Sequence, residues 1–133
     1  MMGQVPPILL SSIICDRVII DRITGSATLI NILQTISAVK YPVRYQMLIY
    51  FCELTNGHGP IDIGIKLVGD QDKVLFSQNG KINFQDVKQI QTLTLNLGNI
   101  VFPEAGEYRF QVFAGETMLG ERRIQCRKIE EKK

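Results

Sequence analysis

Nucleophilic catalysis requires a nucleophile held beside a base, and this sequence offers few candidates for either role. The single histidine, His58, lies in the Gly- and Pro-rich segment "NGHGP" (56–60), which predicts a surface turn. Cys52 precedes it by six residues on an apolar segment, and six extended residues span about 20 Å. The sequence also lacks the GxSxG, HExxH and P-loop motifs. We therefore expect no catalytic residue and no enzymatic activity.

Carboxylates in turns are the second group of candidates, because calcium prefers carboxylate oxygens. Asp70 and Asp72 lie in "GDQDK" (69–73), and Asp16 and Asp21 flank an earlier apolar segment. The pair lacks the dense acidic pattern of a strong site, and Asp is common in turns for local hydrogen-bonding reasons. We expect no metal and no cofactor. The alternative is a ligand- or calcium-binding sandwich that uses the turns at 56–60 and 69–73.

Aromatic and basic residues mixed along a strand can stack nucleic-acid bases, and the segment 41–50 has this composition. Tyr41, Arg44, Tyr45 and Tyr50 are the residues concerned. They adjoin a strand that is apolar on both faces, which favours a place in the core or at an interface. The net charge of +2 is also nearly balanced. The sequence therefore predicts neither a nucleic-acid partner nor a membrane partner.

The three cysteines, Cys15, Cys52 and Cys126, form no CxxC pair and are odd in number. This pattern predicts buried, reduced thiols and excludes a disulfide framework. The apolar run that ends at Cys15 lacks the basic start of a signal sequence, and the bulky Ile14 precedes the cysteine. We expect a first strand there and a cytoplasmic protein.

Short segments with a period of two, separated by turn residues, predict an all-β chain. Ser12 to Ile20 is rich in Ile and Val and predicts a strand. The segment 28–39 fits either a helical stripe or a strand, and its Ile and Thr content favours a strand. Asn79-Gly80 predicts a hairpin turn that pairs Leu75 with Phe84.

The stretch "FPEAGEYRF" (102–110) predicts a structural corner formed by Gly106, Tyr108 and Phe110. In immunoglobulin-like sandwiches a tyrosine at the start of a late strand bonds to the backbone at such a corner, and the residue two positions later enters the core. The apolar residues on both strands of the last hairpin have even numbers, so two residues that face each other have an even sum. An even sum requires a loop with an odd number of residues, three or five, or a bulge at Gly115.

These elements predict a single antiparallel immunoglobulin-like β-sandwich domain over residues 1–133, with about eight or nine strands and flexible ends at 1–8 and 129–133. The segments "CDRVIID" from Cys15, "TGSATLINIL" from Thr24 and "FPEAGEYRF" resemble an uncharacterised bacterial family of small proteins that carry a domain of unknown function. The resemblance implies an immunoglobulin-like sandwich in a bacterial cytoplasm, and it implies no activity.

The segment "KYPVRYQMLIYFCEL" (40–54) is apolar on both faces, which is unusual for a two-layer sandwich. We expect its outward row to mark an interface. The row consists of Leu48, Tyr50, Cys52 and Leu54. The function predicted is a non-enzymatic binding or scaffold module that contacts a protein through a sheet face or edge, in a homodimer or with another protein. The alternative is that segment 28–39 or Pro6-Pro7 covers the row within the same chain.

Overall fold

The computed structural model describes residues 5–131, which form eleven strands and one 3-10 turn. The elements are β1 (Ile8–Ile20), β2 (Ala27–Ile32), β3 (Thr35–Ala38), β4 (Val43–Tyr45), β5 (Ile49–Thr55), β6 (Gly59–Val68), η1 (Asp70–Asp72), β7 (Val74–Phe84), β8 (Ile90–Asn96), β9 (Ile100–Phe102), β10 (Gly106–Ala114) and β11 (Thr117–Lys128).

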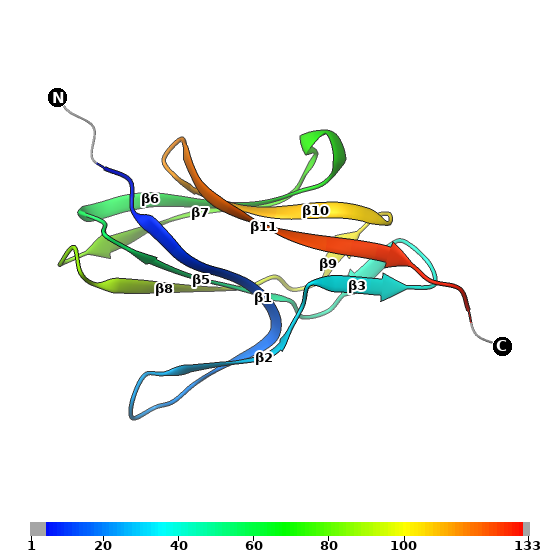
Figure 1. Cartoon of the computed structure of the whole chain (residues 1–133), viewed down its shortest axis with the longest axis horizontal. Helices are drawn as coiled ribbons and strands as arrows, with labels where there is room; N and C mark the ends of the chain where they lie inside the picture. The colour runs from blue at the N-terminus through cyan, green and yellow to red at the C-terminus, as the bar shows by residue number, and fades with distance from the viewer. Residues whose placement is uncertain (1–4, 132–133) are drawn as a thin grey trace.

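Two sheets lie face to face, as Figure 1 shows. One sheet has the strand order β2-β1-β5-β8, the other has the order β3-β11-β10-β6-β7, and β4 and β9 form a small separate ribbon. The predicted all-β sandwich is confirmed. Pairing is antiparallel except between β3 and β11, which run parallel. The strand count exceeds eight or nine because β3, β4 and β9 are only three or four residues long.

The predicted outward row on β5 points inward, so that part of the prediction is wrong. Leu48, Tyr50, Cys52 and Leu54 are completely buried and belong to the hydrophobic core. The Tyr50 ring stacks on Phe110 of the opposite sheet, with 5.1 Å between ring centroids and 14° between ring planes. The hydroxyl of Tyr50 bonds to the hydroxyl of Ser12. A period of two assigns residues to alternating faces, but it does not say which face meets the core.

The outer face of β5 carries the other apolar row. Phe51 lies opposite Ile13 of β1, and Ile49 lies opposite Cys15. Neighbouring strands on both sides leave Ile49, Phe51 and Cys15 buried, although none of them belongs to the core between the sheets. This strand is thus doubly apolar at a central place in the fold, where the other sheet covers its inner face and a strand pairs with it on each side.

The predicted tyrosine corner is confirmed. The Tyr108 hydroxyl donates to the carbonyl oxygen of Glu104 at 2.6 Å and accepts from the Glu104 N–H at 3.2 Å. Gly106 has a φ of 149°, which favours glycine, and Phe110 is fully buried in the core. The corner thus fixes the start of β10 between the two sheets.

The two hairpin predictions have different outcomes. Asn79-Gly80 forms no turn, because β7 runs straight through it and pairs with β6 over almost the whole length of both strands. The β10–β11 hairpin closes with a two-residue loop and contains the bulge that parity required, although the extra residue is Leu119 and not Gly115. Long-range pairing overrides the local turn signal in the first case.

The segment 28–39 is extended, as favoured, and divides into β2 and β3 around Leu33 and Gln34. Of the expected flexible ends, residues 1–4 and 132–133 lie outside the described residues. Ile8 already pairs with Thr55 of β5, and the Ile129 N–H donates to the carbonyl of Ala38. No helix among residues 5–131 has the length and apolar character that crossing a bilayer requires.

Replacing Tyr50 by glutamate should unfold the domain, because the side chain is fully buried in the core. Loss of the ring leaves a cavity, and a carboxyl in its place lacks solvation, so we expect the free energy of unfolding to fall by about 4 kcal/mol or more. Urea denaturation followed by circular dichroism measures the change. The control Met47→Glu changes a half-exposed side chain and should cost less than about 1 kcal/mol. A folded Tyr50→Glu protein with ordinary stability contradicts the inward assignment.

Replacing Tyr108 by phenylalanine removes only the hydroxyl at the corner. The ring contact with Phe102, at 5.1 Å between centroids, remains. Since the lost hydroxyl leaves two backbone groups of Glu104 without their partner, we expect destabilisation by about 1–2 kcal/mol in the same urea assay. An unchanged unfolding midpoint shows that the corner bond contributes nothing to stability.

Candidate interaction surface

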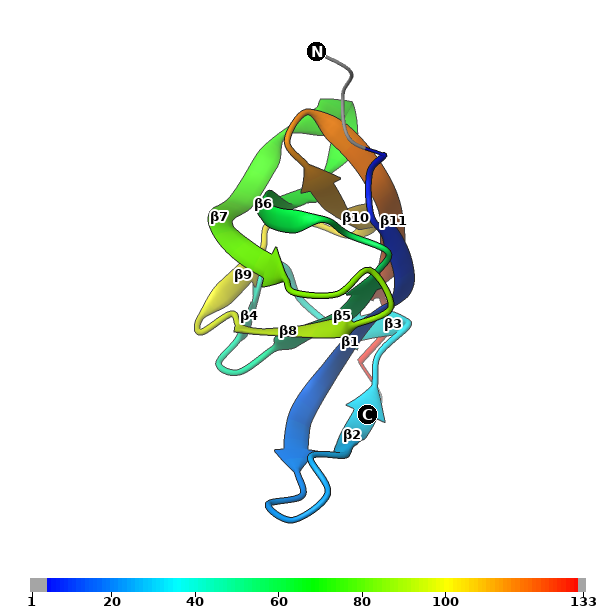
Figure 2. The same cartoon turned by 90° about the vertical axis from the view of Figure 1, so that its left-hand side faces the viewer.

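The β1–β2 hairpin extends beyond the sandwich as a free arm, as Figures 1 and 2 show. β1 pairs with β5 as far as Cys15, and after that residue its one partner strand among residues 5–131 is β2. We call residues 16–32 the arm. No residue of the arm belongs to the hydrophobic core or packs against it.

The tip of the arm is a defined turn. The Asp21 carboxylate accepts hydrogen bonds from the N–H groups of Ile23 at 2.8 Å and Thr24 at 3.0 Å. The Asp21 N–H donates to the Ser26 carbonyl, and Gly25, with a φ of 77°, donates back to the Asp21 carbonyl. These bonds hold the pKa of Asp21 below its ordinary value, the Thr24 N–H contributing most. The turn therefore closes the hairpin without help from the rest of the molecule.

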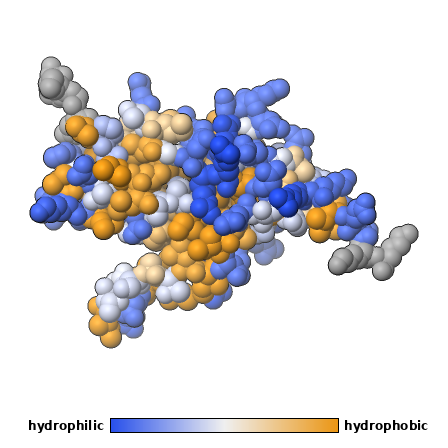
Figure 3. All heavy atoms as spheres, viewed as in Figure 1, coloured by the Kyte–Doolittle hydropathy of each residue, from blue (hydrophilic) through white to orange (hydrophobic). Residues whose placement is uncertain are grey.

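Both faces of the arm carry large apolar side chains. Ile23 at the tip is 95% exposed and Ile20 is 51% exposed. Ile19 and Ile32 are similarly exposed on the opposite face. Val18, Leu29 and Ile30 are half-buried; Val18 lies opposite Leu29 on one face, and Ile30 lies opposite Arg17 on the other. Figure 3 shows apolar atoms at the tip of the arm and in a broad band where the arm joins the sandwich.

The face that carries Ile19 continues the outer face of the β2-β1-β5-β8 sheet. Ile32 lies opposite Cys15, which in turn lies opposite Ile49 of β5. An apolar strip thus runs from the central strand of the sheet onto the arm. A strip of this kind, on an element that has no core of its own, has the composition typical of interaction surfaces.

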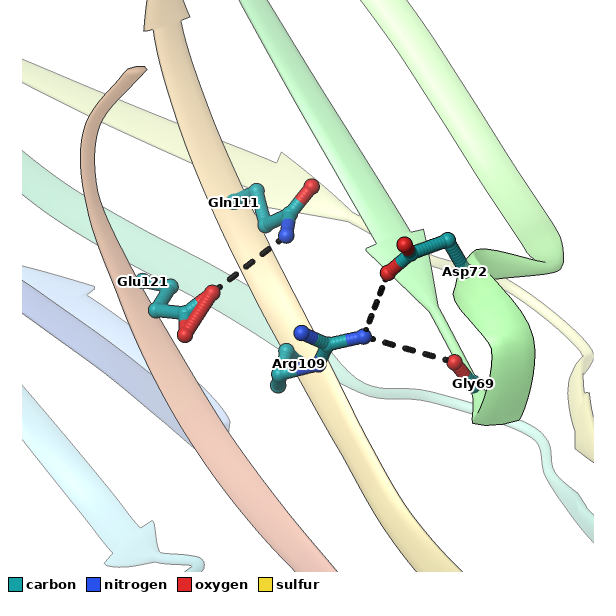
Figure 4. A network of polar contacts seen from close by, with 5 residues as sticks. All are labelled: Gly69, Asp72, Arg109, Gln111 and Glu121. Atoms are coloured by element: carbon teal, nitrogen blue, oxygen red, sulfur yellow. Dashed lines mark hydrogen bonds and ion pairs between the residues drawn. The ribbon is translucent and has the colours of Figure 1, made fainter.

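The two predicted ligand loops lie at opposite ends of β6, which spans ten residues. The turns at 56–60 and 69–73 are therefore about 30 Å apart and cannot form one site. In the second loop Asp72 is occupied, because Arg109 donates to its carboxylate at 2.8 Å and reaches the Gly69 carbonyl at 3.5 Å (Figure 4). No group of three His, Cys, Asp or Glu side chains within residues 5–131 is arranged to hold a metal ion.

The remaining carboxylates and the histidine are also separated. Asp16 accepts a hydrogen bond from the Asn31 side chain within the arm, and Asp21 caps the turn at its tip. Asp70 lines an open surface groove with Glu104 and Glu107. His58 is exposed in its turn, whereas Cys52 lies in the core.

The aromatic residues considered for base stacking have structural contacts. Tyr41 donates to the Arg127 carbonyl at 2.6 Å, and Tyr45 meets Phe102 edge to face at 6.4 Å. Tyr50 is in the core. These rings form no exposed platform for bases.

Sequence reasoning missed the arm, although its signal is present. "CDRVIIDR" and "ATLINI" are both apolar on two faces and flank a segment with turn residues. In a two-layer sandwich the second sheet covers at most one face of a strand. Two strands with apolar residues on both faces therefore expose one apolar face. The sequence prediction placed the exposed row on segment 40–54, because both of its faces are apolar, and did not predict this hairpin as a separate element.

Comparison with known proteins supports the fold and its place in a family. A search of curated proteins found no match. Among solved structures, a crystal structure of the C-terminal domain of wzt is similar, with a TM-score of 0.54 and 12% sequence identity. The match covers 96% of this chain and 77% of that one, so it supports the β-sandwich fold alone. The model of a family of unknown function, DUF6941, matches residues 10–127, and the chain therefore belongs to that family.

Proposed function

We propose that this protein is a non-enzymatic protein-binding module that acts through the arm, with another protein or a second copy of itself as partner. The observation that carries the proposal is an ordered apolar hairpin that extends beyond the core and has no cover within the described residues. The proposed place of action is the cytoplasm, where three free thiols stay reduced.

The energetics of the arm favour an external partner. An isolated two-stranded hairpin is marginally stable in water, and it gains stability when a third strand or another surface covers it. The arm exposes four isoleucines, and beyond Cys15 no strand among residues 5–131 pairs with the second edge of β1. Apolar burial contributes about 25 cal/mol per Å², so covering these side chains supplies binding free energy without a preformed pocket.

The thiols support a role without covalent catalysis. Burial raises the pKa of Cys52 to about 12 and that of Cys126 to about 11, and it raises the pKa of Cys15 as well. A nucleophilic cysteine requires the opposite shift, because the thiolate is the reactive form. His58, the single histidine, lies on the surface, away from all three thiols, which are buried.

Replacing Ile20 by aspartate should abolish association and leave the domain folded. Ile20 is exposed and makes no contact with the core, so we expect a change in unfolding free energy below about 1 kcal/mol. Sedimentation velocity of the purified proteins, together with co-purification from the native cells, should show complexes for the unmodified protein and none for the variant.

Ile90→Asp is the matched control, because Ile90 on β8 is 55% exposed against 51% for Ile20. It should leave complexes intact. The proposed function is contradicted if the two variants behave alike, or if Ile90→Asp alone removes the complex.

The three thiols should not react with Ellman's reagent at pH 8 while the domain is folded, and all three should react in denaturant. The pKa values of the folded protein lie above the ordinary value near 9. The contribution of the buried neutral thiols to the free energy of unfolding is therefore fully present below pH 9. It is lost as pH rises towards about 12 for Cys52. The free energy of unfolding should therefore decrease between pH 9 and pH 12. Rapid labelling of a thiol in the folded state contradicts the buried assignment.

A further inference from the structure

We propose that the occupant of the arm is a second copy of this chain, and that the free edge of β1 pairs antiparallel with the same edge of the copy about a two-fold axis at Ile19. This inference rests on the proposed function of the arm as a protein-binding element. It adds the partner, the strand that pairs and the register.

The free edge has hydrogen-bonding groups available for a new strand. The N–H and C=O of Asp21 both bond towards the β2 side of the hairpin. Since backbone groups alternate between the two edges of a strand, those of Val18 and Ile20 point to the opposite edge. No strand among residues 5–131 pairs with β1 on that edge beyond Cys15. Such an edge is a template for another strand.

The sequence of the edge is complementary to itself. Residues 16–22 read "DRVIIDR"; β1 ends at Ile20, Asp21 still bonds to Ser26 across the hairpin, and Arg22 begins the turn. When the segment is laid antiparallel on a copy with Ile19 opposite Ile19, Arg17 faces Asp21 in strand register, and Asp16 lies towards Arg22 in the turn of the copy. Each of these two pairs occurs twice because of the symmetry. Opposite charges placed directly across antiparallel strands stabilise the pairing.

Neighbouring registers lack this complementarity. Residues opposite each other in an antiparallel pair share a face, so a two-fold arrangement must be centred on a residue, and adjacent choices are Val18 and Ile20. Centring on Val18 places Arg17 against Ile19, and centring on Ile20 places Val18 against Arg22. Both leave charges opposite isoleucine or valine. Among these three centres, Ile19 is the one that pairs every charge with its opposite.

No internal ion pair competes for the arginines within the described residues. The ion pairs found there join Lys81 to Asp62, Arg109 to Asp72 and Arg123 to Glu107, and none involves Arg17 or Arg22. Both arginines are exposed on the arm.

The apolar residues at the centre fit the same register. Val18 faces Ile20 of the copy on one face of the ribbon, and the two Ile19 side chains meet on the other. The result is a continuous sheet in the order β2-β1-β1-β2, in which each hairpin supplies the third strand that stabilises the other. Val18 and Ile20 form the hydrogen-bonded pairs, and the Ile19 pair is the non-hydrogen-bonded one.

A cysteine at the symmetry axis tests the register. In a non-hydrogen-bonded antiparallel pair the Cα atoms are about 4.5 Å apart, within the range that a disulfide spans. Ile19→Cys should therefore form a covalent dimer in oxidised glutathione. The matched control is Thr28→Cys, because Thr28 lies opposite Ile19 on the same arm and is also exposed. Two Thr28 positions are about 14 Å apart in the proposed dimer, beyond disulfide reach. Non-reducing electrophoresis measures both.

Charge exchange tests the same register without a covalent bond. Arg22→Glu places two like-charged pairs in the dimer, and so does Asp16→Lys. Each variant alone should dimerise about tenfold more weakly than the unmodified protein. An equimolar mixture should recover the original affinity, because the introduced glutamate then faces the introduced lysine, and the retained Asp16 of one variant faces the retained Arg22 of the other. We choose this pair because Asp21 holds the turn through two backbone N–H groups, whereas Asp16→Lys removes one side-chain hydrogen bond, that from Asn31.

The outcomes separate this inference from the proposed function. Equal cross-linking of Ile19→Cys and Thr28→Cys, or a mixture no tighter than its components, overturns the register. If the register test fails but Ile20→Asp still abolishes self-association, the arm remains the binding element. A protein that is monomeric at every soluble concentration overturns the second copy as partner. An Ile20-dependent complex with another protein then still supports the proposed function.

Discussion

The contact between Tyr50 and Phe110 joins the two sheets, and the rest of the fold depends on it. The rings stack at 5.1 Å, and each comes from an inner strand of its sheet. This stack directs one apolar row of β5 into the core and leaves the other row outside. Ile49 and Phe51 then require cover from neighbouring strands in the same sheet. β1 provides part of that cover, and β1 is also the strand that continues beyond the sandwich into the arm.

The arm is consequently an extension of the sheet and not an appended loop. Its strands keep the alternation of the sheet, so the outer apolar strip of β5 and β1 continues onto it through Cys15 and Ile32. Within the sandwich, lateral neighbours reduce the exposure of such side chains to a few per cent. On the arm, which has one neighbouring strand in place of two, similar side chains are about half exposed. The more exposed side chains are those with one adjacent strand, and we expect a further strand to reduce their exposure.

Local signals in the sequence predicted the features that depend on neighbouring residues. The corner at Tyr108 follows from a turn, a tyrosine and a core residue at fixed spacing, and the hydrogen bonds to Glu104 confirm it. The residue numbers predicted an irregularity in the last hairpin. In a regular antiparallel pair the numbers of two facing residues have a constant sum, and the apolar residues of this hairpin do not fit that sum with a two-residue loop. The residue numbers could not place the extra residue, which is Leu119 and not Gly115, since a bulge in either strand satisfies the sum.

Features that depend on distant pairing were not predictable in this way. Asn79-Gly80 is a strong turn signal, yet β6 offers a partner for every residue around it and the strand continues. The inward row of β5 was assigned to the surface because both rows are equally apolar, and the choice between them is made by Phe110, which is distant in the sequence. The segments 56–60 and 69–73 are both polar turns, so their composition groups them as ligand loops, whereas β6 holds them apart.

Charges on an exposed strand edge usually prevent association with other strands, because a buried unpaired charge is costly. On β1 the charges have an order that changes this effect. The edge carries four charged residues, Asp16, Arg17, Asp21 and Arg22. They disfavour pairing with a strand that has apolar residues at the facing positions. They also disfavour pairing with a copy of the edge in a shifted register. The charges no longer disfavour pairing only in the register that places each charge across from one of opposite sign. Exclusion of wrong partners and acceptance of one partner are then properties of the same four residues, so specificity on this edge needs no pocket and no additional contact.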